Sequence, residues 1–310
     1  MDILNGSEPI SGPHYFQKLK HKNKPIHVYL LGEEHSNNHQ CYQDGADVGD
    51  VLRAAVIDMN YRVGIYLEMP QSYEANTDPH VICSARPAGT PRKDVLNTIR
   101  SCMLQQRNSP TTSREVRERI SFTDIREFFG LLPYTERENS CINEIKSEGV
   151  ERAWQLLNQY FVAPISDALC TLGGVDEKFR DLIYHMPESR MRPHEHFIYE
   201  NWHRLLMPMA QTVASEYAKF PHNRKASSNR ILHCYRQMMD TFTDLYTTWR
   251  MLSDMDAGTV THAVFYGGSS HAIAISQLLT TASFVSQALF KAPVNTACVR
   301  RKASQIRTSV

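Results

Sequence analysis

Short apolar runs that end in polar residues recur along the chain, and stretches with helical spacing separate them. Residues 26–31 and 63–67 have the length and composition of buried strands. Between them, residues 45–60 carry apolar side chains at helical intervals. A strand, a helix and a second strand within about 40 residues predict a βαβ unit that is right-handed and has parallel strands.

Two more strands are expected, over 120–126 and 262–266, and the second leads through Gly267–Gly268 into a helix. The intervening chain shows only helical spacing, over 149–169, 175–186, 195–220 and 226–254. The predicted fold is therefore α/β: a mainly parallel sheet core flanked by helices, with a large all-helical insertion before the last core strand. We expect an irregular lead-in over 1–24, the first part of the α/β core over 25–130, a helical insertion over 131–256, the last core strand and helix over 257–290 and a basic tail over 291–310.

One long segment, from Ala257 to Phe290, contains no Asp, Glu, Lys or Arg. A membrane span needs about 20 predominantly apolar residues in succession. The polar turn Gly267–His271 interrupts this segment, so a buried strand, a tight turn and a buried helix explain it better. No membrane span is expected.

Composition narrows the class of protein further. Of 310 residues, 42% are hydrophobic and 22% are charged, which supports a sizeable core and excludes global disorder. The formal net charge of +1 argues against a protein that wraps nucleic acid, and no specific nucleic-acid binding is predicted. The 7 cysteines include no C-x-x-C pair, and no basic region precedes an apolar stretch at the N-terminus. These features predict a cytoplasmic, reducing location and no signal peptide.

Ionisable residues follow all four predicted strands at their carboxyl ends. The first strand is followed by Glu33 and His35, and the second by Glu68. In open parallel sheets, ligands bind outside the carboxyl ends of the strands, so these groups are expected to converge on one crevice. The complete set of candidate catalytic residues is Glu33, His35, Glu68, Asp124, Arg126 and His271.

The turn before the last helix has a specific physical interpretation. Two glycines, Gly267 and Gly268, allow a sharp turn and a close backbone approach, and a following serine is expected to cap the helix. His271 then lies in the first helical turn, where the helix dipole disfavours its protonation. A neutral imidazole there can act as a base or as a metal ligand.

Structural roles compete with each of these catalytic roles. Glu33 could cap the next helix or pair with Arg126, and Asp124 could form an internal salt bridge with Arg126. Glu68 follows an apolar run and needs a partner, for which His35 or Arg126 is the natural candidate. A second histidine set, His196, Glu200 and His203, shares one helix face and is interpreted as a solvated or inter-helix polar face.

Two versions of water activation fit the catalytic set. Without a metal, His35 is the general base, Glu33 or Glu68 orients it, His271 polarises the scissile carbonyl or protonates the leaving group, and Arg126 stabilises the oxyanion. With a metal, Glu33, His35, Glu68 and His271 are the ligands of a divalent Zn, Mn or Co ion that activates water.

These motifs resemble the superfamily that contains erythromycin esterases, haem-binding ChaN-like proteins and TIKI/TraB-type metalloproteases. The resemblance lies in Gly32-Glu33-x-His35 after the first strand, Glu68 after the second and a late His271 in a small-residue turn. Asp124-x-Arg126 matches a motif of the forms from large DNA viruses. The chain departs from some esterase members in having one histidine in the final turn rather than two, and TIKI/TraB-type first motifs often lack the carboxylate present here.

The resemblance implies a hydrolase acting on an ester, amide or peptide bond of a small molecule or peptide. Two alternatives stay open: a haem- or metal-binding module without turnover, with His35 or His271 as an axial haem ligand, and an inert structural or interaction protein on the same fold. A viral protein of this kind would reside in the host cytoplasm or the virion.

Overall fold

The computed structural model describes residues 10–34, 46–57, 62–70, 95–125, 177–184, 186–219, 224–291 and 298–299. The chain divides into two compact units, each described by itself below. The sheet unit comprises Met1–Met69, Tyr73–Thr123 and Arg250–Val310, and the helical unit comprises Pro70–Ser72 and Asp124–Trp249.

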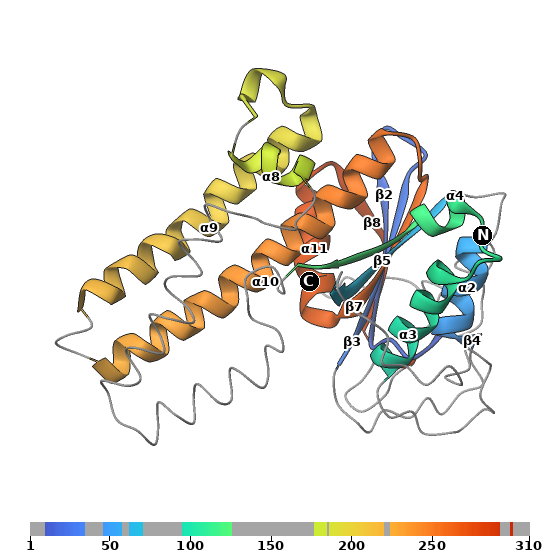
Figure 1. Cartoon of the computed structure of the whole chain (residues 1–310), viewed down its shortest axis with the longest axis horizontal. Coiled ribbons are helices and arrows are strands. Elements are labelled where there is room, and N and C mark those ends of the chain that lie inside the picture. Colours follow the sequence, from blue (N-terminus) through green and yellow to red (C-terminus); the bar gives the residue numbers. More distant parts are fainter. Residues whose placement is uncertain are drawn as a thin grey trace, which may run out of the picture. The chain divides into compact units, whose positions relative to one another are not determined.

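A six-stranded sheet forms the centre of the sheet unit (Figure 1), with the strand order β6-β5-β7-β3-β2-β8. Its strands are β2 Tyr15–His21, β3 His27–Glu33, β5 Val63–Pro70, β6 Ile120–Asp124, β7 His262–Gly268 and β8 Phe284–Lys291. The four strands expected from the sequence are consecutive members of this sheet. The last of them along the chain, β7, lies between the first two and is parallel to both.

The outer strands complete a mixed, mostly parallel sheet. Strand β2 pairs antiparallel with β3 and with β8. On the other side, the Ile65 N–H donates to the Arg119 carbonyl and the Thr123 hydroxyl donates to the Leu67 carbonyl. From the first contact to the second, the residue number increases along both β5 and β6, as it does between parallel neighbours. The α/β class predicted from the sequence is confirmed.

Helices cover both faces of this sheet. The first face carries Tyr29, Leu31, Val264 and Tyr266, which join the hydrophobic core formed with the helices α2 and α3. The opposite face receives α11, which packs on β3 and β7. The helices of this unit are α2 Val48–Ile57, α3 Val95–Asn108, α4 Arg114–Glu118 and α11 Ser269–Thr281, and a small sheet of order β4-β1-β9 is formed by β1 Ile10–Ser11, β4 Ala46–Asp47 and β9 Cys298–Val299.

Three strands correct the sequence-based picture. The lead-in 1–24, expected to be irregular, contains β1 and β2, in which Tyr15, Phe16 and Leu19 are buried. The segment 257–290 contains β8 as well as β7 and α11. Strands β2 and β8 pair with each other although most of the chain separates them in sequence, and no local pattern predicts such a contact. The tail 291–310 lies outside the described residues apart from Lys291, which ends β8, and the short β9.

The helical unit is built on long helices that pack through aromatic side chains. Its elements are α8 Glu177–Tyr184, the short η3 Glu188–Arg190, α9 Pro193–Lys219 and α10 Arg224–Asp256, whose last turns belong to the sheet unit. The Phe179 ring of α8 contacts Phe242, Tyr246 and Trp249 of α10 at centroid distances of 5.6, 5.2 and 5.1 Å. Helices α8, α9 and α10 occupy three of the segments predicted to be helical. The predicted helix over 149–169 lies outside the described residues.

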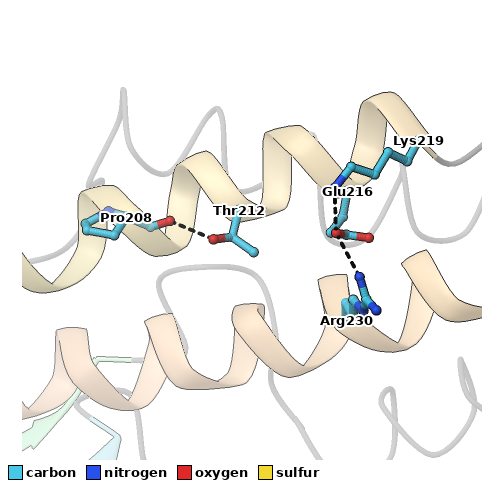
Figure 2. Close-up of polar contacts among 5 residues, drawn as sticks. All are labelled: Pro208, Thr212, Glu216, Lys219 and Arg230. Carbon is cyan, nitrogen blue, oxygen red and sulfur yellow. Dashed lines mark hydrogen bonds and ion pairs between the residues drawn. The ribbon is translucent and has the colours of Figure 1, made fainter.

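A buried carboxylate joins α9 to α10 (Figure 2). Glu216 is 6% exposed, and one of its oxygens lies 3.1 Å from Lys219 Nζ of its own helix and 3.2 Å from Arg230 Nη1 of α10. One turn earlier, the Thr212 hydroxyl donates to the carbonyl of Pro208 at 2.9 Å. Among the described helices, none is long and apolar enough to cross a membrane.

Candidate functional site

The carboxyl ends of β3, β5 and β7 meet at one edge of the sheet. In the parallel register Glu33 is the partner of Gly268, and Leu67 is the partner of Tyr266. Glu68 therefore lies beside Gly267. The α-carbons of Glu33 and Glu68 are two strand spacings apart, about 10 Å. Glu33 and Glu68 therefore flank the last strand, β7, an arrangement that the strand order creates.

Glu68 and His271 form a buried acid–base pair at this edge. Their side chains are almost inaccessible, with residue exposures of 3% and 6%. The Gly268 N–H donates to Glu68 Oε2 at 2.6 Å, and Glu68 Oε1 lies 3.5 Å from His271 Nε2. Helix α11 begins at Ser269, so the carboxylate also lies at the positive end of the helix dipole. Backbone, dipole and imidazole together stabilise a charge that would be costly to bury alone.

Two glycines make the close approach possible. A Cβ on Gly267 would lie 2.7 Å from Glu68 Cβ and 2.8 Å from Glu68 Oε2. A Cβ on Gly32 would lie 2.7 Å from the backbone Cα of Ser269. The absence of these side chains lets the Glu68 carboxylate and the start of α11 pack against the strand ends. The expected role of Gly267 in a close backbone approach is confirmed.

The expected serine cap is wrong. The N-cap residue of α11 is Gly268, which has no side chain to cap the helix, and Ser269 is the first helical residue. The Ser269 hydroxyl instead donates to the backbone carbonyl of Glu33 at 3.1 Å. The reason is tertiary: a carboxylate from the neighbouring strand, Glu68, accepts the Gly268 N–H.

Glu33 lies on the opposite face of the sheet from Glu68. Side chains alternate along a strand, and the register places Glu33 on the face of Tyr266 and Glu68 on the face of Gly267. The Tyr266 hydroxyl donates to Glu33 Oε2 at 2.7 Å, and both residues are buried. Tyr266 is not among the predicted site residues. The signal that could have found it is its position two residues before Gly268, which puts both on the same face of the strand.

Glu34, the residue after Glu33, contacts a histidine of the N-terminal segment. Its carboxylate lies 3.2 Å from Nε2 of His14, and the side chains are 44% and 2% exposed. The His14 backbone N–H also donates to the Gly32 carbonyl at 2.7 Å. His14 is a second residue near this edge that the sequence analysis missed, because it belongs to the segment expected to be irregular.

The remaining predicted site residues have fewer described contacts. Asp124 ends β6 and is 5% exposed, but it belongs to the helical unit, and no geometry relative to Glu68 is assigned. His35 and Arg126 lie outside the described residues. The Asp124–Arg126 salt bridge and the roles of His35 therefore stay predictions.

A metal centre finds limited support in the part of the chain that the structure describes. There, no group of three or more His, Cys, Asp or Glu residues could hold a metal ion. Of the four predicted ligands, Glu68 and His271 adjoin each other and Glu33 occupies the other face. His35 is the fourth, so the complete ligand set stays a prediction.

The second histidine set has the solvated character predicted for it. His196 Nδ1 lies 3.5 Å from Glu200 Oε1, with side-chain exposures of 43% and 65%. The His203 ring packs edge-on against Tyr199, with the centroids 4.5 Å apart. This helix face in α9 shows no ligand arrangement among its described contacts.

Comparisons with protein-family models, with curated proteins and with solved structures find no match to this chain.

Proposed function

We propose that this chain is a hydrolase that activates water at the Glu68–His271 pair and acts on an ester, amide or peptide bond. The observation that carries the proposal is the buried pair itself, with 3.5 Å between Glu68 Oε1 and His271 Nε2 at the carboxyl edge of the sheet. Carboxylate–histidine pairs serve general-base catalysis because the carboxylate orients the imidazole and stabilises its protonated form.

In the proposed reaction, His271 removes a proton from water while the water oxygen bonds to the carbonyl carbon. The tetrahedral intermediate then collapses, the bond to the leaving oxygen or nitrogen breaks, and the imidazolium returns the proton to that atom. Glu68 stays ionised throughout, held by the Gly268 N–H. Its separation from His271 is longer than a strong hydrogen bond, as is common for catalytic contacts before a substrate binds.

Two other predicted residues complete the proposal, and His35 takes a different role from the general base that the sequence predicted. Arg126 would stabilise the developing oxyanion, and His35 would assist proton transfer beside Glu33. Under this proposal the chain belongs to the erythromycin esterase, ChaN-like and TIKI/TraB superfamily and works in a reducing cytoplasm. A viral form would work in the host cytoplasm or in the virion.

The metal-dependent version uses the same edge of the sheet. Glu68 and His271 would supply one oxygen and one nitrogen ligand to Zn, Mn or Co, and a bound divalent ion would acidify its water. That version also needs Glu33, which is directed to the other face and bonded to Tyr266. Glu33 is thus the predicted ligand that the register separates from Glu68. The contacts described favour neither haem binding nor an inert role.

The test is turnover on a panel of chromogenic esters and anilides. We expect Glu68→Gln and His271→Asn each to lower kcat/KM about 100-fold or more, the usual contribution of a positioned base. Gln keeps the shape of Glu68 and can still accept the Gly268 N–H, so the fold should persist. Glu118→Gln, which removes an exposed carboxylate paired with Arg114, should leave turnover unchanged. Full activity in either site variant would refute the proposal.

A further inference from the structure

Basic side chains gather at the other end of the same sheet, where β3 and β7 begin. In the register, Lys20 of β2 is the partner of His27 of β3, and His27 is the partner of His262 of β7. Lys18 is the partner of Tyr29, one pleat further along. Strand alternation puts all four basic residues on one face. We call Lys18, Lys20, His27 and His262 the basic cluster.

The two histidines stack closely. Their rings are nearly parallel, 8° apart, with centroids separated by 5.2 Å. The Thr261 hydroxyl lies 2.9 Å from His262 Nδ1, which fixes the orientation of that ring. Lys18 Nζ lies 5.6 Å from the centroid of the Tyr29 ring, so its ammonium group is held over the same face of the sheet.

Among the described residues, the strands that pair around this cluster carry no acidic side chain at this end of the sheet. Strands β2, β7 and β8 contain no Asp or Glu, and the one acid of β3 is Glu33 at its far end. Next to His262, β5 contributes the apolar Val63, and the preceding Arg62 donates from Nη1 to the Gly258 carbonyl at 2.7 Å.

Burial and nearby positive charges lower the pKa of three members of the cluster. Burial, followed by the charges of Lys18 and Lys20, lowers the pKa of His27 below its ordinary value. Burial, followed by His27 and Lys18, lowers the pKa of His262 to about 4. Burial and the nearby Lys20 lower the pKa of Lys18. Four basic groups therefore share a partly desolvated patch that an anion would stabilise.

One polar atom in the cluster is left unsatisfied. His27 Nδ1 is shielded from solvent and has no hydrogen-bond partner within the described part of the chain. Buried polar atoms are nearly always hydrogen-bonded, so an unsatisfied one is a candidate contact for a ligand. An anion accepting from an Nδ1–H would satisfy it.

We propose that Lys18, Lys20, His27 and His262 form a binding site for a doubly charged phosphate group, either the free ion or the phosphate of a small ester. Lysine ammonium groups bind phosphate as point charges, and protonated imidazoles donate from both ring nitrogens. Binding favours the protonated histidines, so the site takes up protons as it fills. This site is independent of the proposed hydrolase centre, which lies at the opposite edge of the sheet.

Sulfate is the appropriate first probe, because it stays doubly charged while phosphate titrates near pH 6. NMR monitors the ring-proton signals of His27 and His262 while sulfate is added. The chemical shifts of both residues should change together and reach saturation. Affinity should rise as the pH falls from about 6.5 toward 4, since both histidines of the free site have pKa values below the ordinary one and binding favours their protonated forms. Absence of a saturating shift in both histidines would overturn the proposal.

Matched lysine variants separate a site from general screening. Lys18→Met and Lys20→Met should each weaken sulfate binding about tenfold, equal to about 1.4 kcal/mol. Lys24→Met removes the same charge from an exposed position in the β2–β3 turn and should leave affinity unchanged. Equal weakening by all three variants would show nonspecific attraction and overturn the site.

A last comparison identifies the source of the phosphate. Inorganic phosphate and phenyl phosphate are titrated at one fixed pH against the same histidine signals. Similar affinities support the phosphate group of a small ester, and binding of inorganic phosphate alone supports the free ion. If neither shifts the signals, the proposal fails even where sulfate binds.

Discussion

The two ends of the β3–β7 strand pair both bury ionisable side chains, but they stabilise them differently. At the carboxyl end, Glu33 and Glu68 each accept a close hydrogen bond, from Tyr266 and from the Gly268 N–H. At the amino end, His27 and His262 stack against each other, and burial with nearby lysines lowers the pKa of both.

The difference follows from the direction of the strands. Parallel strands place the start of α11, with its unpaired N–H groups and positive dipole end, at their carboxyl ends. A carboxylate there can accept from a backbone N–H, as Glu68 does from Gly268. Among the described helices, none begins at the amino ends of β3 and β7, and the histidines there lower the electrostatic cost by shedding their protons.

The largest effect that tests this comparison is the acid sensitivity of the amino end. His262 has a pKa of about 4 in the folded protein and about 6.5 in an unfolded chain. Between these values the unfolded chain binds the proton and the folded protein does not. Stabilisation from the neutral ring is thus complete above about pH 6.5 and is lost as the pH falls toward 4, by roughly 3 kcal/mol.

Urea denaturation at a series of pH values measures this loss. His262→Phe keeps a flat buried ring that does not titrate, so its free energy of unfolding should change less over the same range. An unchanged pH slope in the variant would mean that other groups cause the acid sensitivity, and the contrast between the two ends would fail.

A second prediction tests the close packing at the carboxyl end. Gly32→Ala should lower the free energy of unfolding by roughly 2 kcal/mol, because overpacking against a backbone atom forces the chain to shift. Its Cβ would lie 2.7 Å from Ser269 Cα. Gly258→Ala is the control: φ is 70° and nothing lies within 4 Å of its Cβ, so only the left-handed backbone costs energy, about 1 kcal/mol. Equal costs would contradict tight packing at Gly32.

A third prediction addresses the donor to Glu33. Tyr266→Phe removes the hydroxyl that bonds Glu33 Oε2 and should cost about 1.5 kcal/mol, as for a bond to a buried charged acceptor. Thermal or urea unfolding gives the value. Tyr199→Phe, on a partly exposed ring of α9, should change stability by less than about 0.5 kcal/mol. If the two variants matched, Tyr266 would not support the buried charge.

The smallest predicted effect concerns the lysines at the amino end. Lys18→Met should raise the pKa of both His27 and His262, without restoring their ordinary values, because burial is the larger cause. NMR titration of the ring protons measures both. Lys24→Met should instead raise the pKa of His21, where burial and then Lys24 lower it. If Lys18→Met and Lys24→Met changed the pKa of His27 and His262 equally, the lysines would act through the overall charge of the protein and not through proximity.

Much of this architecture could be predicted from local patterns. Apolar runs ending in charged or small residues gave β3, β5 and β7, and helical spacing gave α2, α9 and α10. Ordering the strands was beyond the sequence, because nothing local indicates that β7 inserts between β3 and β5. Strand β2 carries lysines among its apolar residues, and β8 has few buried positions, so neither has a clear alternating pattern.

The site was predictable as a list of residues but not as an arrangement. Strand ends identified Glu33, Glu68 and His271, and the glycines indicated a close approach. The register then decided which face each carboxylate occupies, and a shift of one residue would have exchanged them. The start of α11 could not be predicted because the acceptor of its Gly268 N–H, the Glu68 carboxylate, comes from another strand.

The most direct test of the central claim is a double-mutant cycle on turnover with Glu68→Gln and His271→Asn. Residues that act as one catalytic unit lose little more activity together than alone. We therefore predict that the double variant is about as slow as the slower single variant. Losses that multiply, or turnover that survives both substitutions, would contradict a Glu68–His271 catalytic pair.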